Sequence, residues 1–265
     1  MFLGVVMQDQ KIPIEILDTQ ALKDSASYSR TILETEIDDV HVEHIAIAAK
    51  KSITESAQEG VRTVYLFVKG EGKILAEDNN YELVPETIFL PNNVRDFKIS
   101  AANNSEVHCL KISRSLSDQD HIEIQKLPQN NVKAVYHAKF SDCQSYTEEI
   151  KSLNTVSRTI LSNEYIPRVA MGTVLTKGPD KVAPHKHPML EQLFLGLSRN
   201  NCVVYADDST VSFPEFSIVH IPLGSTHSVS VEQGEVLYYV WMDFFLDKKG
   251  EEWLQTHNVD STSAL

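Results

Sequence analysis

The sequence predicts an all-β chain made of two similar halves, each folded as a barrel or sandwich. Two observations predict this. Apolar and β-branched runs of about four to eight residues alternate with turn residues along most of the chain, which is typical of short strands. The segment Ser29 to Leu33 recurs as Ser157 to Leu161, and at the same offset the apolar run 65–67 meets 193–195. Many short strands at regular spacing indicate barrels or sandwiches, and the repeat indicates two of them.

The expected strands are the apolar runs themselves, and the expected turns are clusters of Gly, Asn and Asp, which tolerate the positive φ of tight hairpins. Strands are predicted at 44–47, 63–68, 87–90, 107–112, 169–175, 192–195, 202–205, 216–221 and 236–242, with turns at 70–72, 78–80, 199–201 and 207–209. Helical spacing is confined to 145–153 and to the tail around 251–254.

The repeat divides the chain into an N-terminal barrel over residues 1–116 and a C-terminal barrel over residues 155–265. Residues 117–154 are polar and lack clean alternation, so they are predicted to connect the two.

The composition argues against several classes of binding partner and indicates a cellular location. The 265 residues include 37 acidic and 24 basic side chains, a formal charge of −13, which repels phosphate backbones and anionic lipid. We therefore expect neither nucleic acid nor membranes as partners. The three cysteines lie far apart in no metal-like spacing, which predicts reduced thiols and a cytoplasmic protein. The apolar start at 2–6 is too short for a signal peptide.

The candidate site lies in the second half. His185 and His187 are two residues apart, so in an extended strand both project from one face, and Glu191 adds a carboxylate four positions later. A turn formed by Pro222 and Gly224 precedes His227 and is predicted to return a third imidazole to the first two. Three imidazoles and one carboxylate suit one divalent ion of iron, manganese, nickel, cobalt or zinc.

The ordered pattern His-x-His, three residues, Glu, and a later Pro-x-Gly-x-x-His resembles the two motifs of the cupin superfamily over residues 172–245. The resemblance implies small double-stranded β-helix barrels, and with the repeat it implies a two-cupin chain with minor helical segments. The family's four metal ligands fall on His185, His187, Glu191 and His227. Gly178 lies one residue further from the histidines than the family glycine, and residues 198–201 replace the family's glycine turn.

The first half keeps the strand pattern without these ligands. At the repeat offset, Ala57, Glu59 and Thr63 stand where His185, His187 and Glu191 stand. Aligning Pro91 with Pro222 places Asp96, next to Arg95, opposite His227. We expect no comparable metal site there.

Other candidate residues have simpler interpretations. Gln192 is expected to point to the face opposite Glu191, which makes it a poor ligand. The remaining histidines are expected to be packed or exposed side chains rather than ligands: His41, His44, His108, His121, His137, His220 and His257. Four aromatic residues are open to either core packing or lining a substrate cavity: Tyr205, Tyr238, Tyr239 and Trp241. Arg30 and Arg158 are open to either starting equivalent strands or binding an anion.

The resemblance implies a metal-dependent enzyme acting on a small polar metabolite, since two-cupin proteins include sugar-acid isomerases and dioxygenases. Isomerase, lyase and dioxygenase chemistry on a sugar-acid-like or keto compound all remain open. The alternative is a non-catalytic, metal-containing protein that binds a small molecule. A homodimer formed through the metal-free barrel is also open.

Overall fold

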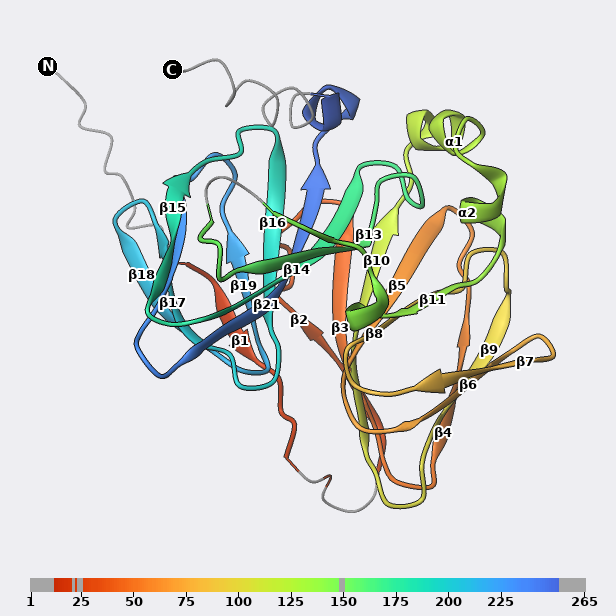
Figure 1. The fold of residues 1–265 in the computed structure, drawn as a ribbon. Coiled ribbons are helices and arrows are strands. Elements are labelled where there is room, and N and C mark those ends of the chain that lie inside the picture. The colour runs from red at the N-terminus through yellow and green to blue at the C-terminus, as the bar shows by residue number, and fades with distance from the viewer. Residues whose placement is uncertain (1–11, 21, 23–25, 148–150, 253–265) are drawn as a thin grey trace, which may run out of the picture.

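The structure is a computed structural model that describes residues 12–20, 22, 26–147 and 151–252, and it contains two β-barrels side by side (Figure 1). Each barrel is a large sheet facing a four-stranded one. In the N-terminal barrel the large sheet has the order β11-β8-β5-β10-β3-β2 and the small sheet β4-β9-β6-β7. The strands are β2 (Tyr28–Ile32), β3 (Val40–Ile47), β4 (Ser52–Ser56), β5 (Val61–Lys69), β6 (Gly72–Ala76), β7 (Asn79–Leu83), β8 (Thr87–Leu90), β9 (Asp96–Ala101), β10 (Val107–Ser115) and β11 (Tyr136–Lys139).

The C-terminal barrel repeats this plan, with a large sheet of order β1-β19-β16-β21-β14-β13-β12 and a small sheet β15-β20-β17-β18. Its strands are β1 (Ile14–Ile16), β12 (Ser145–Tyr146), β13 (Val156–Leu161), β14 (Val169–Lys177), β15 (Asp180–His185), β16 (Leu190–Gly196), β17 (Asn201–Ala206), β18 (Ser209–Pro214), β19 (Ser217–Ile221), β20 (His227–Val231) and β21 (Val236–Phe245). The predicted all-β fold of two barrels is confirmed.

Segments at the edges of the two barrels cross between them. β1 comes from the first residues of the described chain but pairs antiparallel with β19 of the C-terminal barrel. The segment predicted as a connection contains α1 (Asp118–Ile124), α2 (Gln129–Lys133) and the short helix η2 (Phe140–Asp142). It also supplies β11 to one sheet, next to β8, and β12 to the other, next to β13.

Helix is minor, as expected, and one of the two predicted helical segments is wrong. The helix expected at 145–153 is instead a strand at Ser145–Tyr146, and residues 148–150 lie outside the described residues. In the tail, residues 248–252 are helical and the rest lies outside the described part. Among the described residues, no helix is both long and apolar enough to cross a membrane.

The two large sheets pack face to face, and this interface is a hydrophobic core in its own right. Side chains of the N-terminal sheet such as Leu66 and Leu110 share one buried cluster with Leu195 and Met242 of the C-terminal sheet. Each barrel interior has a separate cluster, containing Tyr65 in the first barrel and Phe194 in the second. The central strands of the large sheets, such as β5 and β16, are therefore buried on both faces.

This burial pattern fixes how the two halves correspond. Tyr65 and Phe194 both face a barrel interior, whereas Leu66 and Leu195 both face the interface between barrels. The repeat offset at β5 and β16 is thus one residue longer than the offset of the sequence repeat at Ser29 and Ser157. Because a shift of one residue reverses the faces of a strand, the residue equivalent to Thr63 is Gln192 rather than Glu191.

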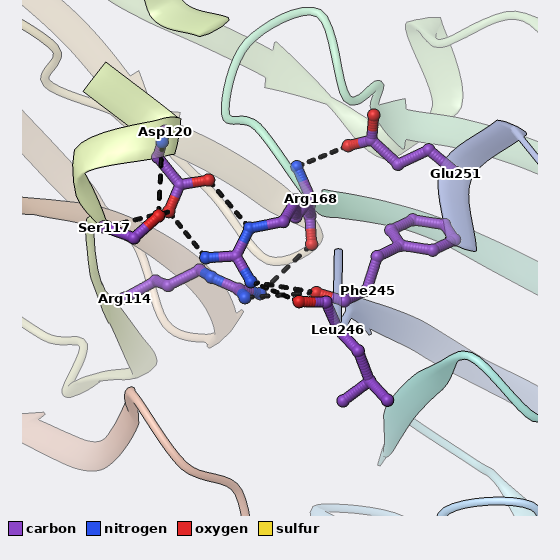
Figure 2. A network of polar contacts seen from close by, with 7 residues as sticks. All are labelled: Arg114, Ser117, Asp120, Arg168, Phe245, Leu246 and Glu251. Carbon is purple, nitrogen blue, oxygen red and sulfur yellow. Dashed lines mark hydrogen bonds and ion pairs between the residues drawn. The ribbon is translucent and has the colours of Figure 1, made fainter. Parts of the chain in front are cut away.

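A buried network of charged groups also joins the barrels (Figure 2). Arg168, before β14, binds Asp120 of α1 through two hydrogen bonds, Nε to Oδ1 at 2.7 Å and Nη2 to Oδ2 at 2.5 Å. Arg114 of β10 donates to the backbone oxygens of Arg168 and Phe245, at 3.1 and 3.2 Å. Arg168 also donates to the carbonyl oxygen of Leu246 at 2.9 Å. The side chain of Asp120 is 1% exposed, so little water competes for these bonds.

We predict that Arg168→Met lowers the free energy of unfolding by about 3 kcal/mol, because it leaves the buried Asp120 carboxylate without its partner. Arg30→Met is the control, since Arg30 also forms an ion pair, with Glu15 at 3.0 Å, but the Arg30 side chain is 47% exposed. Exposed pairs contribute about 0–1 kcal/mol, so the control stays close to the wild type in chemical denaturation. Equal losses in the two variants would contradict this interpretation.

A second buried polar pair lies on the interface face of the N-terminal sheet. His44 Nε2 and His108 Nδ1 are 3.2 Å apart, and both side chains are fully buried. Burial, followed by the neighbouring charge of His108, lowers the pKa of His44 to about 4. Burial, followed by Lys69, lowers the pKa of His108 to about 4. The folded protein therefore holds both rings neutral.

This pair predicts an acid-sensitive fold. The unfolded chain binds protons on these histidines below about pH 6.5, whereas the folded chain does not until about pH 4, so stability falls as the pH drops through that window. Between pH 7.5 and 5 we expect a loss of about 1–2 kcal/mol per histidine. The double variant His44→Gln/His108→Gln, measured by urea denaturation, should show a correspondingly weaker pH dependence. If the pH dependence of stability were the same in the double variant and the wild type, His44 and His108 would not be its source.

Candidate metal centre

Three histidines meet at one end of the C-terminal barrel. His185 ends β15 and stands directly opposite His227, the first residue of β20, while His187 follows in the loop to β16. Each ring offers one nitrogen, and these three atoms all lie within 4.8 Å of one another. The rings of His185 and His227 have centroids 4.3 Å apart, and His187 lies 5.0 and 5.5 Å from them. The predicted convergence of these histidines is thus present in the structure.

Backbone carbonyls orient two of the rings. His185 Nδ1 lies 2.8 Å from the Ala183 oxygen, and His227 Nδ1 lies 3.3 Å from the Ser225 oxygen. A carbonyl oxygen only accepts, so each Nδ1 carries the hydrogen and each Nε2 keeps a lone pair. This is the arrangement that metal-binding histidines adopt.

The environment of His227 favours a metal over a proton. Burial, followed by the charges of His185 and His187, lowers its pKa to about 3. The side chain is 3% exposed, and its Nε2 has no hydrogen-bond partner among the described residues. A buried nitrogen with a free lone pair costs stability unless something binds it. The donor set therefore fits a divalent transition ion.

Aromatic side chains close the barrel below the histidines. The Phe194 ring lies 5.9 Å from His227 and 4.8 Å from Tyr239, and all three belong to the barrel interior or its edge. His185 and His187 are only partly buried, whereas His227 is buried, so two of the three rings keep some contact with solvent.

Glu191 does not join the three histidines. Its carboxylate lies on the interface face of β16, where Oε2 is 3.0 Å from His220 Nε2. The other ring nitrogen of His220 is 2.9 Å from Glu36 Oε2, in the N-terminal barrel. Glu191 and His220 thus form part of the contact between barrels, and His220 is packed, as the sequence interpretation expects.

Gln192 occupies the inward position instead. It lies two residues before Phe194 on the interior face of β16, and its cross-strand neighbour on β21 is Asp243. The amide Nε2 donates to Asp243 Oδ1 at 2.7 Å. Gln192 and Glu191 point to opposite faces of the strand, as predicted. Gln192, however, is the residue that points into the barrel interior, and Glu191 points to the interface between barrels. The sequence signal for this pair is Asp243, a carboxylate within the apolar run of β21.

Several other predicted residues have structural roles. Tyr239 packs in the barrel interior, with Trp241 against the same cluster. Tyr238 donates from its hydroxyl to Glu86 Oε2 at 2.5 Å, and Tyr205 is 37% exposed on β17. Arg30 and Arg158 sit on equivalent strands, β2 and β13, and bind Glu15 and the carbonyl oxygen of Cys143.

At the corresponding place in the N-terminal barrel, the cross-strand pair His185–His227 is replaced by Ser56–Asp96. Ser56 Oγ donates to Asp96 Oδ1 at 2.6 Å. The pair Gln192–Asp243 is replaced by Thr63–Ser113, whose hydroxyl oxygens are 3.0 Å apart.

Comparison with known proteins relates this architecture to a widespread fold. No family model matches the sequence, and no curated protein matches it significantly. Among solved structures, a cupin 2 conserved barrel domain protein from Leptotrichia buccalis has a TM-score of 0.57 at 17% identity, covering 85% of this chain and 91% of its own. The chain has the cupin fold.

Two further cupin-fold neighbours align over most of the chain. Protein Ylba from E. coli has a TM-score of 0.65 at 10% identity, covering 88% of this chain and 90% of its own. Oxalate decarboxylase from Lactobacillus farciminis, in a formate complex, has a TM-score of 0.61 at 11% identity. The alignment covers 92% of this chain and 90% of the decarboxylase chain. At such identities the likeness establishes the cupin fold alone.

We predict that the purified protein, reconstituted with Co²⁺ or Mn²⁺, binds one ion per chain. His227→Ala should lower the affinity for this ion by at least about tenfold, because it removes the buried ring nitrogen. Isothermal titration and elemental analysis measure this. His121→Ala, on the exposed side of α1, is the control and should bind as the wild type does. Unchanged binding in His227→Ala would contradict the site.

Proposed function

We propose that the C-terminal cupin barrel is a metal-dependent enzyme acting on a small polar metabolite, by isomerase, lyase or dioxygenase chemistry on a sugar-acid-like or keto compound. The observation that carries the proposal is the convergence of one ring nitrogen from each of the three histidines, all within 4.8 Å of one another. A divalent ion held there supplies a Lewis acid that polarises a substrate oxygen, or a position for water or dioxygen.

The chain's own residues support that chemistry in three ways. His185 and His227 hold their tautomers through backbone carbonyls, so no rearrangement is needed when a ligand binds. Phe194 and Tyr239 limit water on the inner side of the site. His185 and His187, being partly exposed, leave the outer side open to a small molecule.

The activity test compares wild type and His227→Ala, each reconstituted with Fe²⁺, Mn²⁺, Ni²⁺, Co²⁺ or Zn²⁺. A panel of keto acids and sugar acids is incubated with each protein and analysed by NMR and mass spectrometry. We expect turnover of one class by the wild type and a loss of at least about a hundredfold in the variant. Turnover that survives metal removal would refute the proposal.

Ligand retention without product would instead support the second class of function, a metal-containing protein that binds a small molecule. We further propose a cytoplasmic location, because Cys109, Cys143 and Cys202 are all free thiols, and burial raises the pKa of Cys202 to about 12. A homodimer remains a proposal that sedimentation of the full chain would test.

A further inference from the structure

We propose that Gln192, and not Glu191, supplies the fourth protein ligand of the metal centre, through its amide oxygen, and that Asp243 positions this amide. The inference rests on the proposed function, since it concerns the ion that the three histidines hold.

The first argument is the direction of the side chain. Successive residues of a strand point to opposite faces. Phe194 is on the interior face of β16 and its ring lies 5.9 Å from His227, so Gln192, two residues earlier, shares the face that looks toward the histidines. Its cross-strand neighbours are Ile221 on one side, an interior residue, and Asp243 on the other.

The second argument is the state of the amide. Gln192 is 6% exposed, and its Oε1 is buried with no hydrogen-bond partner among the described residues. The neighbouring Asp243 carboxylate accepts hydrogen bonds, so the NH₂ group must face it, at 2.7 Å, and the oxygen must face away. An unpaired buried carbonyl oxygen costs about 1–3 kcal/mol unless something binds it. Gln192 Oε1 and His227 Nε2 are both buried polar atoms without a hydrogen-bond partner among the described residues, and both belong to the C-terminal barrel.

The third argument is the position of the Glu191 side chain. Its carboxylate is already engaged with His220 on the opposite face of the sheet. Moving it to the histidines would require β16 to slip by one residue, which would also turn Leu193 and Leu195 out of the core between the barrels. The N-terminal barrel has Thr63 and Ser113 at the positions of Gln192 and Asp243. At these equivalent positions, the amide and its carboxylate are therefore found in the barrel that holds the histidine cluster.

An amide ligand changes the charge of the centre. Three imidazoles and one amide are all neutral, so an ion held by them keeps its double charge, and the Asp243 carboxylate binds the amide nitrogen rather than the ion. Coulomb attraction falls with distance, so the open positions favour an anionic oxygen donor more than they would with a carboxylate ligand. We infer that the small molecule bound there is a carboxylate or a similar anion.

The test measures the affinity of the full chain for Co²⁺ and the visible absorption of the bound ion. Gln192→Leu replaces the amide with an apolar side chain of similar size that lacks the oxygen, and we expect the dissociation constant for Co²⁺ to rise at least about tenfold with a changed spectrum. Asp243→Ala should raise it by about 10–100-fold, because the amide loses its orientation. Glu191→Gln, the adjacent residue on the other face, is the matched control and should retain both affinity and spectrum.

An exchange of the two side chains provides a second test, which does not depend on weakened binding of the metal ion. In the double variant Q192E/D243N the amide and the carboxylate trade places, so the hydrogen bond is kept and the negative charge moves to the ligand. Co²⁺ should bind at least as tightly as in wild type, and azide, used as an anionic probe, should bind the loaded protein at least about threefold more weakly.

The outcomes separate this inference from the function on which it rests. Loss of Co²⁺ affinity in Glu191→Gln with retention in Gln192→Leu would overturn the inference, as would wild-type affinity and spectrum in both variants. Unchanged azide affinity in Q192E/D243N would overturn the anionic ligand class. Failure of the wild type to bind Co²⁺ would instead refute the proposed metal centre itself.

Discussion

The packing of the two large sheets against each other is the constraint on which the rest of the structure depends. It buries one face of each sheet against the other barrel, while the opposite face is buried in its own barrel. The strands β3, β5, β10, β14, β16 and β21 therefore carry apolar residues on both faces. Polar groups inside these strands need partners, and the structure supplies them in pairs such as His44–His108 and Gln192–Asp243.

This constraint explains what the sequence predicts well and what it does not. Runs of β-branched and apolar residues between Gly, Asn and Asp turns predict most strands, and the repeat predicts two barrels. A strand buried on both faces has no alternation of polar and apolar residues, however, so the run 190–196 does not reveal which side chains point inward. The spacing from His187 favours Glu191, whereas the register of β16 turns Gln192 inward. Segments that cross between barrels, such as β1, depend on contacts distant in sequence and leave no local signal.

The two barrels show how one scaffold carries different chemistry at equivalent positions. The cross-strand pair at equivalent positions of the small sheets is Ser56–Asp96 in one barrel and His185–His227 in the other. Ser56 and Asp96 satisfy each other through a 2.6 Å hydrogen bond. The two histidines instead direct one nitrogen each to a backbone carbonyl, which leaves Nε2 of His227 buried and unbonded. A closed polar pair contributes stability, whereas an open pair keeps binding capacity, so the hydrogen bonding, rather than the fold, distinguishes the halves.

The links between the barrels also bear on the rigidity of the centre. β16 presents Gln192 and Phe194 to the barrel interior, and from its other face Glu191 reaches His220, which in turn bonds to Glu36 of the N-terminal barrel. A rotation of one barrel against the other would strain this link and the Arg168–Asp120 pair together. Side chains held on a strand that is fixed from both faces keep their positions more precisely than side chains on loops. The N-terminal barrel therefore contributes to the site as a support for β16, although the three histidines all belong to the other barrel.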